Sequence, residues 1–88
     1  MQGWKTFKAK NANDTIDFYP YQNVLVFEPI TPLYRENDTF LFESWKDVDI
    51  IKEFLKRNPE ADSKEIAKII KKCRDIEYEF NLLKEKEE

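Results

Sequence analysis

Apolar residues recur at spacings of three and four in the C-terminal third of the chain. The series runs for eighteen residues and contains no glycine or proline. Positions at these spacings share one face of an α-helix, so the pattern predicts one long amphipathic helix from about residue 63 to residue 84. Such a helix has to lay its apolar face on another surface. The members of the series are Ile66, Ile69, Cys73, Ile76, Phe80 and Leu83.

Alternating and continuous apolar runs in the first half of the chain predict four strands. These strands cover residues 4–9, 15–19, 23–27 and 39–43. The third run, from Val24 to Phe27, is continuous, which indicates a strand that is covered on both faces and is therefore central in the sheet. Pro20 and Pro29 stand at strand ends, where a missing backbone donor costs least.

A shorter helix is predicted between the strands and the long helix. Two pairs of residues have the spacing of a capping box, and they predict helix starts near residues 45 and 63. Asn58-Pro59 would end the shorter helix, because the residue before a proline is disfavoured in helical geometry. The capping pairs are Ser44 with Asp47 and Asp62 with Glu65, and the expected buried residues of the shorter helix are Val48, Ile51, Phe54 and Leu55.

These elements predict an α+β fold, in which a small four-stranded antiparallel sheet of two hairpins is followed by two helices, the second long and amphipathic. The 88 residues suffice for one domain, expected at residues 1–84, with residues 85–88 as a charged and frayed tail. The tripeptide Asn-Asp-Thr precedes two of the strands, at 13–15 and 37–39. Because the chain has one glycine, Asn and Asp are expected to supply the turn conformations there.

The sequence lacks the residues from which most catalytic sites are built. Histidine is absent, which removes the most versatile general base and the commonest metal ligand. Cys73 has no second cysteine to pair with and lies in the apolar series, so we expect a buried, inert thiol. With Gly3 as the one glycine, no Gly-rich phosphate loop can form. We therefore predict that the protein is not an enzyme, with no catalytic residue, metal, cofactor or small-molecule substrate.

Targeting signals are also missing from the sequence. The first residues lack the apolar run of a signal peptide, and no stretch is long and apolar enough to cross a bilayer. Together with the single cysteine, this predicts a cytoplasmic, intracellular protein without a membrane partner.

Charge is segregated along the C-terminal half of the chain. The net charge of −3 argues against binding nucleic acid by bulk electrostatics. Residues 52–74, however, carry eight basic and four acidic side chains, whereas residues 75–88 carry two basic and six acidic ones. Lys64, Lys68, Lys71 and Lys72 form a basic stripe on the long helix, which is either a solvated face or a surface that contacts phosphates.

Residues 51–83 also resemble the three-helix half of winged-helix and helix-turn-helix proteins. In that resemblance, residues 51–55 would form the first helix, 63–70 the second and 74–80 the recognition helix. It implies that the last of these segments lies in a DNA groove. No helix breaker separates the second and third segments, however, and the third is acidic where phosphates would lie. One uninterrupted helix explains the same residues.

Two further segments carry candidate binding residues. Within residues 4–10, Trp4 and Phe7 are interleaved with lysines, a pattern that suits either base stacking beside phosphates or a guarded sheet edge. The proline-flanked segment 28–36 carries Ile30, Leu33 and Tyr34, which would either cover the core or anchor a partner.

The sequence as a whole favours a non-enzymatic protein-interaction module, either a small accessory or regulatory subunit or an inhibitor of a larger intracellular assembly. The partner would be a larger protein or a second copy of the chain. We expect the long helix to outrun the sheet and expose its last turns, so the expected contact residues are Ile30, Leu33, Tyr34, Phe80 and Leu83. The alternative is a degenerate helix-turn-helix-like domain of nucleic-acid machinery that binds through Lys64, Lys68, Lys71, Lys72, Trp4 and Phe7.

Overall fold

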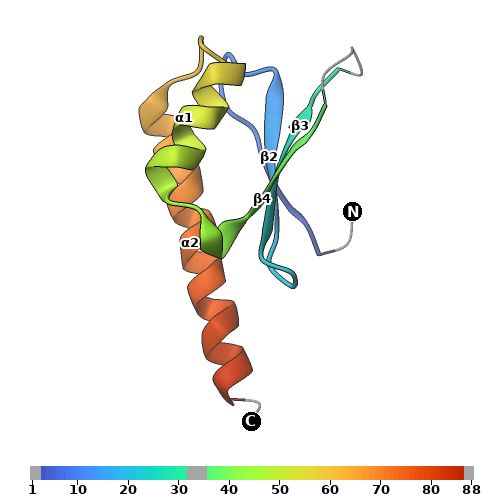
Figure 1. Cartoon of the computed structure of the whole chain (residues 1–88), viewed down its shortest axis with the longest axis vertical. Coiled ribbons are helices and arrows are strands. Elements are labelled where there is room, and N and C mark those ends of the chain that lie inside the picture. The colour runs from blue at the N-terminus through green and yellow to red at the C-terminus, as the bar shows by residue number, and fades with distance from the viewer. Residues whose placement is uncertain (1–2, 32–35, 87–88) are drawn as a thin grey trace.

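A four-stranded sheet carries two helices on one of its faces in the computed structural model of the chain (Figure 1). The structure describes residues 3–31 and 36–86. This arrangement confirms the predicted α+β fold. In chain order the elements are β1 (Lys5–Phe7), β2 (Asp14–Tyr19), β3 (Val24–Pro29), β4 (Asp38–Leu41), the 3-10 helix η1 (Phe42–Ser44), α1 (Asp47–Arg57) and α2 (Ser63–Lys86).

The sheet is a continuous antiparallel meander with the order β1-β2-β3-β4. The two predicted hairpins are therefore joined by a further antiparallel pairing between β2 and β3. The register places Ile16 opposite Phe27 and Leu25 opposite Phe40, so the large apolar side chains share the face toward the helices. Val24 and Val26 occupy the opposite face of β3 and are only partly buried. The third strand is thus central, as predicted, but the prediction that both of its faces are covered was wrong, because the helices lie on one face of the sheet.

The core lies between that sheet face and the two helices. Phe27 holds its centre, because its ring packs against the rings of Phe40 and Phe54 at centroid distances of 4.8 and 5.0 Å. Cys73 is fully buried, as predicted. The other core residues are Ile16, Phe18, Leu25, Phe42, Ile50, Ile66, Ile69 and Ile70.

The long helix is uninterrupted, which confirms the prediction from the apolar series. α2 contains 24 residues and packs against α1. Its start uses half of the predicted capping box: the backbone N–H of Lys64 donates to Asp62 Oδ1 at 3.3 Å. Glu65 instead accepts a hydrogen bond from the backbone N–H of Lys10 at 2.9 Å. Helix-turn-helix geometry for residues 63–83 was therefore the wrong alternative, since no turn divides the helix.

The predictions for the shorter helix were partly wrong. Ser44 belongs to η1, and α1 begins at Asp47 without a side-chain hydrogen bond at its N-cap. Ile50 and Phe54 are the fully buried residues, whereas Val48 is 53% exposed. Because α1 starts later than predicted, Val48 lies in its first turn. Ile50 and Phe54 are four residues apart, so they share the helix face that contacts the core. Ile51 and Leu55 are partly buried.

Asparagine supplies left-handed backbone conformations, but not at the predicted tripeptides. Within residues 3–31 and 36–86, positive φ occurs at Gly3 (88°), Asn11 (59°) and Asn23 (55°). The Asn-Asp-Thr tripeptides instead lead directly into β2 and β4, whose first residues are Asp14 and Asp38. The prediction that those tripeptides supply the turn conformations was therefore wrong, since Asn13 and Asn37 have no positive φ and the left-handed residue before β2 is Asn11.

Candidate functional site

Four aromatic rings form a connected row from the uncovered sheet face to the end of α2. Trp4 lies against Tyr19, Tyr19 against Tyr21 and Tyr21 against Phe80, with ring-centroid distances of 5.0, 5.4 and 5.1 Å. We call these four residues the aromatic strip. Tyr21, in the turn between β2 and β3, is 61% exposed, and the other three side chains are partly buried. The strip is therefore a surface feature and not part of the core.

Gly3 allows this close approach of the tyrosines. Its φ of 88° suits glycine, and a Cβ atom at this position would lie 3.0 Å from Tyr19 and 3.3 Å from Tyr21. A larger residue would therefore be strained at this φ and would require the two rings to shift by a few tenths of an ångström.

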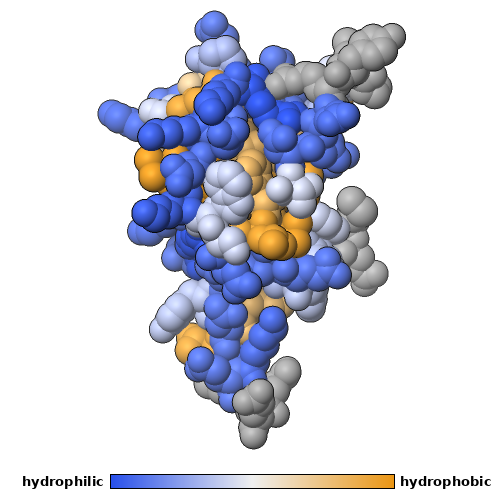
Figure 2. All heavy atoms as spheres, in the orientation of Figure 1, coloured by the Kyte–Doolittle hydropathy of each residue, from blue (hydrophilic) through white to orange (hydrophobic). Residues whose placement is uncertain are grey.

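The last turns of α2 continue the apolar surface past the strip. Leu83 follows Phe80 by three residues and is 56% exposed, and Tyr78 and Leu82 are exposed on the other side of the helix. In Figure 1 the end of α2 extends below the sheet, and Figure 2 shows hydrophobic atoms beside it among hydrophilic ones. The predicted contact residues Phe80 and Leu83 thus lie together, next to Tyr21, which the sequence reasoning did not single out.

A small groove of about 170 Å³ separates the β2–β3 turn from α2 beside the strip. Glu43 and Glu77 line it, together with Lys84. Asn23 donates from Nδ2 to Glu77 Oε2 at 2.8 Å, but its Oδ1 atom is buried without a hydrogen-bond partner in the described structure. Glu77 Oε1 also accepts from Arg74 Nη1 at 3.1 Å, so its carboxylate is already paired, and Glu43 is the exposed carboxylate that lines the groove.

The predicted contact residues of the proline-flanked segment lie elsewhere. Ile30 is 52% exposed and so does not cover the core. Leu33 and Tyr34 lie outside the described residues. Ile30 is accessible to a partner, but the length of β3 separates it from the strip.

The alternative site residues are divided between two places. Phe7, Lys64, Lys68 and Lys72 line a cleft of about 590 Å³ between β1 and α2, and Lys71 is not among its lining residues. Trp4 belongs to the aromatic strip instead. The cleft also includes Lys8, Lys10 and Asn11, which follow β1 and which the sequence reasoning missed as site residues. The signal that could have found Lys8 and Lys10 was the alternation of lysines with Trp4 and Phe7 along residues 4–10.

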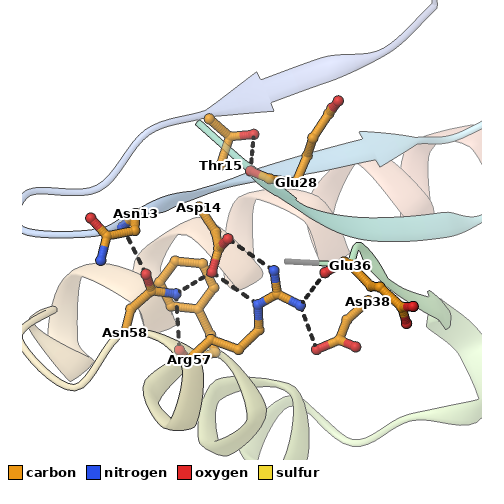
Figure 3. A network of polar contacts seen from close by, with 9 residues as sticks. Asn13, Asp14, Thr15, Glu28, Glu36, Asp38, Arg57 and Asn58 are labelled. Carbon is orange, nitrogen blue, oxygen red and sulfur yellow. Dashed lines mark hydrogen bonds and ion pairs between the residues drawn. The ribbon is translucent and has the colours of Figure 1, made fainter. Parts of the chain in front are cut away.

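Arg57 joins the starts of two strands to the end of α1 (Figure 3). Its Nε and Nη2 atoms donate to the two oxygens of Asp14 at 2.9 Å, and Nη1 contacts Asp38 Oδ2 at 3.0 Å. Asn58 Nδ2 also donates to Asp14 Oδ2, at 2.7 Å. Bonding to Asp14 raises the pKa of Arg57 further above its ordinary value. Both Asn-Asp-Thr tripeptides therefore supply a carboxylate to the same guanidinium, which makes this a structural network.

Arg74 also has a structural position. It donates from Nε to Asp47 Oδ1 at 2.6 Å and from Nη1 to the carbonyl oxygen of Phe42 at 2.8 Å. Its guanidinium lies over the Phe42 ring, 3.6 Å from the centroid. In the sequence, Arg74 was counted with the basic residues of the helix. In the structure its guanidinium instead binds the segment between β4 and α1 to α2.

The uncovered sheet face carries one acidic pair. Asp17 and Glu28 lie on neighbouring strands, and Thr15 donates to Asp17 Oδ1 at 3.1 Å. A hydrogen bond to Asp17, burial and repulsion by the Asp17 charge raise the pKa of Glu28 above its ordinary value. Glu28 therefore keeps its proton to a higher pH than an isolated glutamate does.

Membrane spans and metal sites are both absent from the described residues. No helix there is long and apolar enough to span a membrane. No group of three or more acidic or cysteine side chains in that part of the chain is placed to hold a metal ion.

Comparison of the chain with protein-family models, with curated proteins and with solved structures found no match. The two surfaces described above, the aromatic strip and the cleft between β1 and α2, are therefore the basis on which a function can be proposed.

Proposed function

We propose that the protein is a non-enzymatic protein-interaction module, acting as a small accessory or regulatory subunit or as an inhibitor of a larger assembly. It would dock through the aromatic strip and the adjoining end of α2. The observation that carries this proposal is the unbroken row of rings from Trp4 to Phe80, which leads to the exposed Leu83.

The composition of this surface suits a protein partner. Tyrosine and tryptophan bury large areas at low cost in side-chain entropy, and they dominate the binding energy of protein interfaces. Tyr21 is already in contact with two other rings, so little of its freedom remains to be lost on binding. Its ring nevertheless stays largely exposed, which leaves area to be covered.

The charges around the strip indicate what the partner presents. Exposed Glu43 lines the groove beside Tyr21, and residues 75–85 carry four acidic side chains, of which Glu77 is paired with Arg74, against one lysine. A complementary partner therefore has an apolar surface bordered by lysine or arginine. A symmetric dimer through this surface would bring its acidic residues together, which favours a different protein over a second copy.

The test compares two double variants of the full chain. Tyr21→Ala with Leu83→Ala removes exposed apolar groups from the proposed surface, and Ile30→Ala with Val48→Ala removes exposed apolar groups elsewhere. A binding protein isolated from the native host with the wild-type chain is purified, and its affinity for each chain is measured by calorimetry. We expect the strip variant to lose about 2 kcal/mol or more of binding free energy, and the control variant to lose little.

Equal affinity of all three chains would contradict the proposal. Loss of binding in the Ile30 and Val48 variant alone would place the interface at the segment after β3 or at α1. Self-association as the sole stoichiometric interaction would replace the foreign partner by a second copy.

A further inference from the structure

We propose that the cleft between β1 and α2 binds the phosphate backbone of a single-stranded nucleic acid. This inference goes beyond the docking function and uses a different surface. Its basis is a concave site with basic walls from two segments that lie more than fifty residues apart in the chain. The lining residues that carry the argument are Lys8, Lys10, Lys64, Lys68, Lys72 and Phe7.

The two walls of the cleft are held in place by the fold. The backbone N–H of Lys10 donates to Glu65 Oε1 at 2.9 Å, which ties the segment after β1 to the first turn of α2. Asn11 then turns the chain with a φ of 59°. On the α2 side, Lys64, Lys68 and Lys72 repeat every four residues, so they line one side of the helix at intervals of about 6 Å.

The cleft has a positive local charge within a protein of net negative charge. Among the described residues, five lysines line it against two carboxylates, those of Asp62 and Glu65. In the described part of the chain, none of these five lysines takes part in an ion pair. The arginines Arg57 and Arg74, by contrast, are engaged in ion pairs that hold the fold. The lysine charges are therefore available to an external anion.

The shape of the cleft favours a single strand over a duplex. Reading a duplex groove requires a protruding helix or strand, whereas single strands bind in basic grooves that follow the backbone and offer aromatic surface to bases. Partly buried Phe7 and buried Ile69 contribute apolar surface to this cleft. Flexible ammonium groups suit repeated phosphates and give little base specificity.

The experiment titrates the purified full chain with fluorescein-labelled oligothymidylate and oligouridylate, followed by fluorescence anisotropy at several salt concentrations. Backbone phosphates occur in both probes, so both are expected to bind. If three to five phosphates are neutralised, the slope of log affinity against log salt should be about −2 to −3.5, at about 0.7 per phosphate. Lys68→Glu with Lys72→Glu should weaken binding by at least about tenfold and reduce the slope by roughly 0.7 for each phosphate that is no longer neutralised.

A matched control removes the same charge from another helix. Lys52→Glu with Lys56→Glu has the same spacing on α1, where both side chains are exposed and outside the cleft. We expect its affinity to stay within about twofold of the wild type, because distant charges are screened. Lys8→Gln with Lys10→Gln tests the opposite wall and should also weaken binding. All these side chains are exposed, so melting temperatures should hold.

Failure of both oligonucleotides to bind at low salt would overturn the inference. So would equal losses of affinity in the cleft and control variants, which would indicate bulk electrostatics, or tighter binding of duplex DNA than of the single strand. Polyglutamate that binds as tightly as the oligonucleotides would also overturn it, by identifying the cleft as a site for acidic peptides.

Discussion

Asp14 is fully buried at the start of β2, and its charge is compensated by Arg57 and Asn58 (Figure 3). A buried carboxylate that loses its cation keeps the cost of desolvation without the attraction that offset it. Removing one member of the pair should therefore lower the free energy of unfolding strongly, because the other charge stays buried without compensation. It also fixes α1 on the sheet, because Arg57 contacts β4 through Asp38 as well.

Replacing one member of this pair should be far more costly than replacing both. We expect Arg57→Met to lower the free energy of unfolding by about 3 kcal/mol, because it leaves the Asp14 carboxylate buried beside an apolar side chain. The double variant Asp14→Asn with Arg57→Met should lose clearly less than the sum of the single variants. Urea unfolding of the four chains measures the coupling, and strictly additive losses would show that the pair contributes nothing beyond its separate residues.

The ionisation and the chemical reactivity of the buried Cys73 thiol should depend on whether the chain is folded. Burial raises the pKa of Cys73 to about 12 from an ordinary value of 9.0, against a smaller opposing effect of Arg74. The unfolded chain therefore ionises first, and this thiol's contribution to stability is present below pH 9 and falls as pH rises from about 9 to 12. At about pH 8, iodoacetamide should label the unfolded chain readily and the folded chain hardly at all, as measured by mass spectrometry. Rapid labelling of the folded chain would contradict this burial.

At the scale of elements, α2 has two parts with different surroundings. Its first half contributes Ile66, Ile69 and Ile70 to the core, whereas Phe80 is partly buried and meets Tyr21 edge to face. The helix continues to Lys86, past the sheet that covers its first half. The same apolar series therefore produces core contacts at one end and accessible surface at the other.

This division can be measured as a difference between two phenylalanines. Phe54 is fully buried, so Phe54→Ala should lower the free energy of unfolding by about 3–5 kcal/mol. Phe80→Ala should cost about 1–2 kcal/mol, since part of its ring is already in water. Chemical unfolding of both variants tests this expectation. Equal losses would mean that Phe80 belongs to the core, and a partner would then have to be sought at other exposed residues.

The sequence predicted elements well where one periodicity dominates. The spacing from Ile66 to Leu83 was enough to predict α2, and the apolar runs were enough to predict the four strands. Val48 was wrongly expected to be buried and Ile50 was left out, because the side of α1 that is buried depends on where the helix begins and on the elements that it meets. Ser44 failed as a cap because the chain forms a 3-10 turn there first. The buried side and the start of α1 depend on tertiary contacts, which the local spacing of apolar residues does not predict.

The candidate surfaces were harder to predict, because each joins segments that are distant in sequence. Phe80 was expected at the docking surface, but its neighbours Tyr21, Tyr19 and Trp4 come from the other end of the chain. The lysine stripe of the helix was visible in the sequence, but the cleft requires Lys8 and Lys10 opposite it. These residues come together through the order of the strands, which periodicity alone does not specify.

At the scale of the whole molecule, the two surfaces lie at different levels of an elongated body of 44 × 25 × 20 Å. Lys72 of the cleft and Phe80 of the aromatic strip are eight residues apart on α2, which corresponds to about 12 Å along the helix. The two surfaces are therefore neighbours on one molecule. A small protein with this arrangement could hold a nucleic-acid strand next to the protein that it binds.

The most direct test of the docking surface is site-specific crosslinking from the aromatic strip. A photoreactive phenylalanine derivative replaces Tyr21 in one chain and Val48, also exposed, in a control chain, and each is irradiated in the native host. We expect a crosslink of defined mass from position 21 to one protein, and none to that protein from position 48. Crosslinks to the same protein from both positions, or from position 48 alone, would contradict docking through the aromatic strip.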